Sequence, residues 1–183
     1  HGFPVACGMA TALKRKGSSS RVYTVVGDGD TLPLGKHTLT FVTAPMVHWP
    51  EVMVEYEEKE KVLFSADGFG NFGGLTYTPD WGDEARRYYA NIVGKYGVQV
   101  QGLLKKAAAL EIASVCPLHG PRLSGDALAR ALELYGHWAA WKPEEKGVLV
   151  AFASFHGHTA EAAKYMAKCL EEQGEKVELI DLN

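Results

Sequence analysis

Residues 148–159 indicate the fold class most clearly, and they read Val-Leu-Val-Ala-Phe-Ala-Ser-Phe-His-Gly-His-Thr. The apolar start of this stretch, residues 148–154, predicts a buried strand, and the Ser, His and Gly residues that follow predict a tight loop. Small apolar residues then recur at helical spacing over residues 159–172, and residues 177–180 predict a second strand. Strand, helix and strand in this order form a βαβ unit, which predicts the opening of a doubly wound parallel sheet.

A linker is predicted immediately upstream of this unit, over residues 139–146. Its part 141–146 reads Trp-Lys-Pro-Glu-Glu-Lys and combines a helix breaker with a cluster of charges. We therefore expect one domain over residues 1–138 and a second over residues 147–183. Two strands cannot complete a parallel sheet that is covered on both faces, so we expect the second domain to be only the first part of a larger one.

The region before the linker is predicted to mix short strands with helices. Strands are expected where β-branched and aromatic residues cluster, and helices where apolar residues recur every three or four positions. The expected strands span residues 21–26, 38–43, 51–56, 61–65 and 112–115, and the expected helices span residues 80–96, 98–110 and 126–135. This mixture predicts an α/β protein.

Composition and charge exclude several classes of protein. The 183 residues include 19 basic and 22 acidic side chains with no long block of either sign, so we expect no nucleic acid or anionic membrane as a partner. Cys7, Cys116 and Cys169 are widely spaced and form no Cys-x-x-Cys pair, which argues against a disulfide framework and favours a reducing cytoplasm. No apolar run approaches the roughly 20 residues of a membrane span.

Three possible metal ligands, His48, Asp67 and His119, each follow a short predicted strand. A sheet that ends several strands at one edge gathers the residues after them in one cleft, and two imidazoles with a carboxylate suit zinc or iron. Each residue also has an ordinary interpretation, because a histidine near Pro and Trp can simply pack in a loop and an Asp before Gly often forms a turn. Three aromatic residues, Trp49, Phe69 and Trp81, could line a pocket there or belong to the core.

The loop after the strand at 148–154 is a candidate phosphate site. Backbone N–H groups and the helix dipole favour an anion at such a strand-to-helix turn. The candidate residues are Ser154, Phe155, His156, Gly157, His158 and Thr159. The loop lacks the Gly-Lys-Ser/Thr ending of a Walker loop, and the alternative is an ordinary turn with Thr159 as the helix N-cap.

Three segments, together with the linker and this loop, resemble the flavodiiron proteins, which join a metallo-β-lactamase-like domain to a flavodoxin-like domain. The segments are residues 45–50 (Pro-Met-Val-His-Trp-Pro), 63–70 (Leu-Phe-Ser-Ala-Asp-Gly-Phe-Gly) and 116–121 (Cys-Pro-Leu-His-Gly-Pro). The resemblance spans nearly the whole chain. It implies an α/β fold in which part of a metallo-β-lactamase-like αββα sandwich precedes the first βαβ unit of a flavodoxin-like doubly wound sheet.

The resemblance also implies an enzyme that reduces O2 to water or NO to N2O at two non-haem irons, with electrons passed through FMN. His48 would bind one iron, His119 the other, and Asp67 would bridge the two, so these metal ligands are also the expected catalytic residues. The FMN phosphate would lie on the loop Ser154–Thr159. The resemblance further implies an electron donor such as rubredoxin or another flavoprotein, and a head-to-tail homodimer that brings the flavin of one subunit near the irons of the other.

Two departures from the family lead us to expect an internal fragment that is inactive alone. The family's His-x-Glu-x-Asp-His motif, which supplies the other four iron ligands, does not occur in the sequence, and the later flavin-binding loops are absent. His156 and His158 stand where the family usually has Tyr and Asn, although an imidazole can still donate to phosphate. The alternatives are a zinc-dependent hydrolase of the metallo-β-lactamase superfamily and an FMN-binding electron-transfer module.

Overall fold

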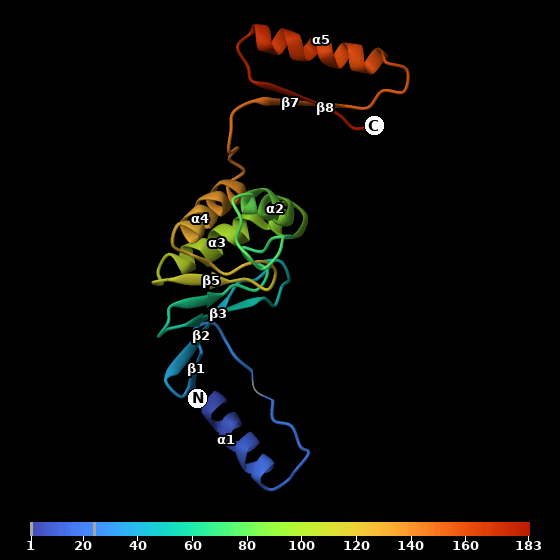
Figure 1. Cartoon of the computed structure of the whole chain (residues 1–183). Helices are drawn as coiled ribbons and strands as arrows, with labels where there is room; N and C mark the ends of the chain where they lie inside the picture. The colour runs from blue at the N-terminus through green and yellow to red at the C-terminus, as the bar shows by residue number, and fades with distance from the viewer. Residues whose placement is uncertain (1, 24) are drawn as a thin grey trace. The chain divides into compact units, whose positions relative to one another are not determined.

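The computed structural model describes residues 2–23 and 25–183, and the chain divides into two compact units, His1–Lys142 and Pro143–Asn183 (Figure 1). The division falls inside the range 139–146, where the sequence predicts a linker. The first unit contains a mixed sheet with helices on one side, and the second contains two strands and a helix.

The sheet of the first unit has six strands in sequence order. They are β1 (Thr31–Leu34), β2 (His37–Thr43), β3 (Met53–Glu57), β4 (Val62–Phe64), β5 (Ser114–Cys116) and β6 (Leu123–Ser124). Neighbouring strands are antiparallel except β4 and β5, which are parallel and pair Leu63 with Val115. Both of these residues are buried. Because β4 and β5 run in the same direction, the residues that follow them lie at the same edge of the sheet.

The helices of this unit include α1 (Gly2–Arg15), α2 (Trp81–Tyr88), α3 (Gly97–Ala107) and α4 (Gly125–Ala139). Figure 1 shows α2, α3 and α4 on one side of the sheet. Between α2 and α3 the chain forms a π-helical turn, η1 (Tyr89–Val93), and a 3-10 turn, η2 (Gly94–Tyr96). The single regular helix predicted over 80–96 is therefore wrong in its second half. Apolar residues of the three helices and of the sheet form one core, which includes Trp81, Leu123 and Tyr135.

The strand predicted over residues 21–26 is also wrong for the residues described. Residues 21–23 and 25–26 have no regular structure, and Thr24 lies outside the described residues. Tyr23 and Val25 are 82% and 92% exposed. A β-branched and aromatic run favours a strand only where a partner strand and a packed face are present, and these side chains have neither.

The second unit confirms the predicted βαβ order. It consists of β7 (Val148–Phe152), α5 (His158–Glu172) and β8 (Val177–Asp181), and the two strands are parallel with Val150 opposite Leu179. Val150 and Phe152 pack with Ala163 of the helix in a small core. Over the described residues of both units, no helix is at once long enough and apolar enough to cross a membrane.

Candidate metal centre

Asp67 and His119 lie beside each other because they follow the two parallel strands β4 and β5. The pairing continues past the strands, where the Leu118 N–H donates a 2.8 Å hydrogen bond to the Ala66 carbonyl. Asp67 directly follows Ala66, and His119 directly follows Leu118. The parallel register therefore places a carboxylate and an imidazole at one edge of the sheet.

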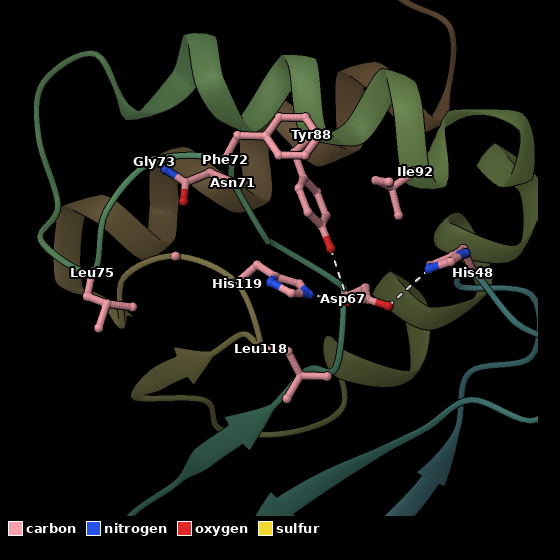
Figure 2. A pocket seen from close by; sticks show the side chains of 11 residues that line it. His48, Asp67, Asn71, Phe72, Gly73, Leu75, Tyr88, Ile92, Leu118 and His119 are labelled. Atoms are coloured by element: carbon pink, nitrogen blue, oxygen red, sulfur yellow. Dashed lines mark hydrogen bonds and ion pairs between the residues drawn. The ribbon is translucent and has the colours of Figure 1, made fainter.

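His48 reaches the same edge from the loop between β2 and β3. Two backbone hydrogen bonds close this loop: the Ala44 N–H donates to the Val52 carbonyl (2.8 Å) and the Met46 N–H donates to the Trp49 carbonyl (2.7 Å). These bonds hold the loop as a compact turn. Its shape presents His48 to Asp67 (Figure 2).

Strained backbone is concentrated in the loops that carry His48 and Asp67. Met46, Ala66 and Phe69 have positive φ values of 65°, 51° and 65°, which side chains with a Cβ rarely adopt. Such residues cost free energy and persist where the surrounding structure holds a functional geometry. The observation marks this edge of the sheet as a candidate site independently of the residue types.

The two oxygens of Asp67 each face one imidazole. Oδ2 lies 3.1 Å from Nε2 of His48, and Oδ1 lies 3.5 Å from Nε2 of His119. The Asp67 side chain is 16% exposed, that of His48 25% and that of His119 61%. The structure therefore brings together the three residues that the sequence analysis grouped (Figure 2). Their roles as metal ligands stay predictions.

The types and spacing of these donors fit two metal ions that share Asp67. Two donors that are each about 2.1 Å from one ion, at an angle of about 90–110°, lie about 3.0–3.4 Å apart. The two nitrogen-to-oxygen separations here are close to that range. Within the described part of the chain, however, no group of three or more His, Cys, Asp or Glu side chains could hold an ion. Each ion would need additional ligands.

Tyr88 is a site residue that the sequence does not reveal, because its spacing predicts only a place on an apolar helix face. Its hydroxyl donates a 3.0 Å hydrogen bond to Oδ1 of Asp67. Burial raises the pKa of Tyr88, and the charge of Asp67 and this hydrogen bond raise it further. The phenol is therefore a stable donor to the carboxylate. Its approach depends on Gly70, where a Cβ would lie 2.7 Å from the Tyr88 ring.

A cavity of about 550 Å³ opens above these groups. Besides His48, Asp67 and His119, its lining residues are Asn71, Phe72, Gly73, Leu75, Tyr88, Ile92, Leu118 and Gly120. Of the three aromatic candidates from the sequence, Phe69 and Trp81 are core residues with 2% and 1% exposure, and Trp49 is 59% exposed and does not line the cavity. No periodicity in the sequence separates Phe72 and Tyr88, which do line it, from core aromatic residues.

The candidate phosphate loop lies between β7 and α5. Gly157, with a φ of +86°, is the N-cap and α5 begins at His158, so the alternative of Thr159 as the cap is wrong. Within the described residues, the hydroxyls of Ser154 and Thr159 make no hydrogen bond. Asn183 donates a 3.4 Å hydrogen bond to the Ser154 carbonyl. The loop thus offers free hydroxyls beside a helix N-terminus, and its role in binding phosphate stays a prediction.

Residues 8–120 match a family model described as ODP family beta lactamase. This range contains β1 to β5 and the three candidate metal ligands. The match therefore concerns the unit that carries the cavity.

Individual relatives extend the match into the second unit. The rubredoxin-oxygen oxidoreductase of Megalodesulfovibrio gigas is 33% identical over 85% of this chain and 41% of its own length. The nitric oxide reductase of Moorella thermoacetica is 32% identical over 88% of this chain and 42% of its own length. A crystal structure of the flavodiiron protein from Giardia intestinalis is similar with a TM-score of 0.81 and 29% identity, over 89% of this chain and 42% of that one. The chain spans about two fifths of the length of these relatives.

Proposed function

The chain belongs to the ODP family of β-lactamase-like proteins, among the flavodiiron proteins, and on that premise we propose that it is part of an enzyme that reduces O2 to water or NO to N2O. The observation that carries the proposal is the placement of Asp67, whose two oxygens face two different imidazoles. A carboxylate in that position is suited to bridge two metals, each with its own histidine.

In the proposed site His48 binds one iron, His119 binds the other and Asp67 bridges them. A pair of irons would bind the diatomic molecule and pass to it the electrons that arrive through the flavin. Because no third His, Cys, Asp or Glu side chain of the described residues joins either histidine, the remaining ligands in this proposal come from outside this set.

The rest of the cavity supports a small and weakly polar substrate. Phe72, Leu75, Ile92 and Leu118 give much of its lining an apolar character, which suits O2 or NO better than a charged molecule. Tyr88 donates to Asp67 and so fixes the orientation of the carboxylate between the two imidazoles. Tyr88 thus orients the bridge, and the apolar side chains line the approach to it.

The second unit is proposed to bind FMN, whose phosphate would take the loop Ser154–Thr159. The free hydroxyls of Ser154 and Thr159 and the left-handed Gly157 support this assignment. Electrons would reach the flavin from a donor such as rubredoxin or another flavoprotein, and a head-to-tail homodimer would bring flavin and iron together. The free thiols of Cys7, Cys116 and Cys169 favour a cytoplasmic location.

Metal and flavin analysis of the full-length protein tests the proposal. We expect iron, a flavin absorption band, and consumption of O2 or NO that depends on a reduced electron donor. Zinc without flavin, together with hydrolytic activity, would instead assign the site to a metal-dependent hydrolase. Flavin without any metal would instead identify the protein as an electron-transfer module.

A further inference from the structure

Asn71 is buried in the wall of the cavity with an unpaired carboxamide oxygen. The residue is only 6% exposed, and among the described residues its Oδ1 has no hydrogen-bond partner. Buried amide oxygens are nearly always paired, because burial removes the hydrogen bonds that water would provide. We therefore expect this oxygen, which lies beside a candidate metal site, to accept a hydrogen bond when metal is bound.

The Asn71 side chain is held in a slot between two residues that lack a Cβ. A Cβ at Gly120 would lie 2.1 Å from Oδ1, and one at Gly73 would lie 3.0 Å from Nδ2. The Asn71 backbone also donates a 3.1 Å hydrogen bond to the carbonyl of His119. The carboxamide thus lies against the loop that carries the candidate iron ligand.

His119 has a ring nitrogen that lacks a partner as well. Nε2 is the nitrogen that faces Asp67, so Nδ1 is left on the other side of the ring, without a hydrogen bond to the described part of the chain. A histidine that binds a metal almost always donates its second N–H to a carbonyl, a carboxylate or water, which fixes the tautomer and the plane of the ring. His119 needs such support, since its side chain is 61% exposed.

We propose that Asn71 is a positioning residue for His119, in which Oδ1 of Asn71 accepts a hydrogen bond from the Nδ1–H of His119 when iron is bound. The inference rests on the proposed function, because it takes Nε2 of His119 as the iron-binding nitrogen. The pairing gives the buried Asn71 oxygen its missing donor. It also holds the imidazole in the tautomer that leaves Nε2 free for the metal.

The test compares Asn71→Leu and Asn71→Asp in the full-length iron-loaded protein. Leu keeps the branched shape but has no acceptor, whereas Asp keeps an acceptor in the same place. We expect Asn71→Leu to weaken iron binding by about 10–100-fold in competition with a chelator, and Asn71→Asp to retain wild-type affinity. Asn91→Leu is the matched control, since the amide of the exposed Asn91 side chain donates to the Arg87 carbonyl and the substitution should not affect iron.

The thermal midpoint of the iron-free proteins separates positioning from folding, and we expect it to be similar in all variants. If the Asn71→Leu protein does not fold, Asn71→Ala removes the same acceptor without added bulk and should weaken iron binding equally. Wild-type iron affinity in a folded variant without the acceptor overturns the inference. So does an Asn71→Asp protein that binds iron as weakly as Asn71→Leu. A wild-type protein that binds no iron refutes the proposed function itself, and the inference with it.

Discussion

The hydroxyl of Tyr88 donates a 3.0 Å hydrogen bond to Oδ1 of Asp67, and so connects the helical layer to the loop that follows β4. The neighbouring Tyr89 has the opposite character: its hydroxyl is buried and has no hydrogen-bond partner among the described residues. Two adjacent tyrosines of one helical segment thus offer a matched comparison.

Tyr88→Phe should destabilise the protein by about 1–3 kcal/mol, because it removes the hydroxyl that donates to the partly buried Asp67 carboxylate. Tyr89→Phe should be neutral or stabilising by up to about 1 kcal/mol, because it removes a hydroxyl that burial leaves unpaired. Chemical denaturation of the two variants measures both effects. Equal losses of unfolding free energy in the two variants would show that the Tyr88 hydroxyl contributes no specific bond.

Gly70→Ala should displace Tyr88 and weaken its bond to Asp67, since the added Cβ would lie 2.7 Å from the ring. Overpacking of this kind costs about 1–3 kcal/mol of unfolding free energy. The control is Gly102→Ala in α3, where a Cβ meets nothing within 4 Å and helix propensity predicts a gain of about 0.5–1 kcal/mol. A Gly70→Ala protein as stable as the Gly102→Ala protein would refute the close contact.

Glu57 should make stability depend on pH. Burial alone would raise the pKa of Glu57, but hydrogen bonds from the Glu60 N–H, from His37 and from the Lys59 N–H lower it below its ordinary value of 4.5. A carboxyl whose pKa is lower in the folded protein stabilises the fold above its unfolded pKa, and this contribution disappears as the pH falls through the folded value. Unfolding free energies measured from pH 7 to pH 3 should therefore converge for wild type and Glu57→Gln. A constant difference over that range would contradict the assignment.

Gly157→Val should weaken binding of FMN by the full-length protein. The φ of +86° at Gly157 is unfavourable for any residue with a Cβ, so the substitution should distort the N–H groups at the start of α5. Because a Cβ there meets no atom within 4 Å, the effect should come from the backbone and not from a clash within the protein. Fluorescence titration should show a larger loss for FMN than for riboflavin, which lacks the phosphate. Equal losses for the two flavins would argue against a phosphate site.

Much of the fold and the grouping of the site follow from local pattern in the sequence. The apolar run at 148–152 and the helical spacing after it predict β7 and α5, because a βαβ unit is built from neighbouring segments. His48, Asp67 and His119 could be grouped because each follows a strand, and strand ends meet at sheet edges. The run 21–26 shows the limit of this reasoning, since its composition favours a strand although its described residues pair with no other strand.

The contacts made by Tyr88 and Asn71 could not be predicted from the sequence. Tyr88 has the spacing of a core residue, and its contact with Asp67 depends on the clearance left by Gly70, which lies far from it along the chain. Asn71 looks like a turn residue in a Gly-rich stretch, and only the three-dimensional structure reveals that its carboxamide is buried against Gly120. The π-helical turn η1 is likewise a product of packing, since no local signal distinguishes it from a regular helix.

The most direct test of the account is the iron content of the full-length protein with and without the Asp67 carboxylate. Asp67→Ala removes the only side chain that faces both His48 and His119 in the described structure, and Asp126→Ala on the first turn of α4 is the control. We predict that wild type and the control bind a pair of irons and that Asp67→Ala loses the pair. An Asp67→Ala protein that still binds both irons and reduces O2 or NO at the wild-type rate would contradict the bridging role.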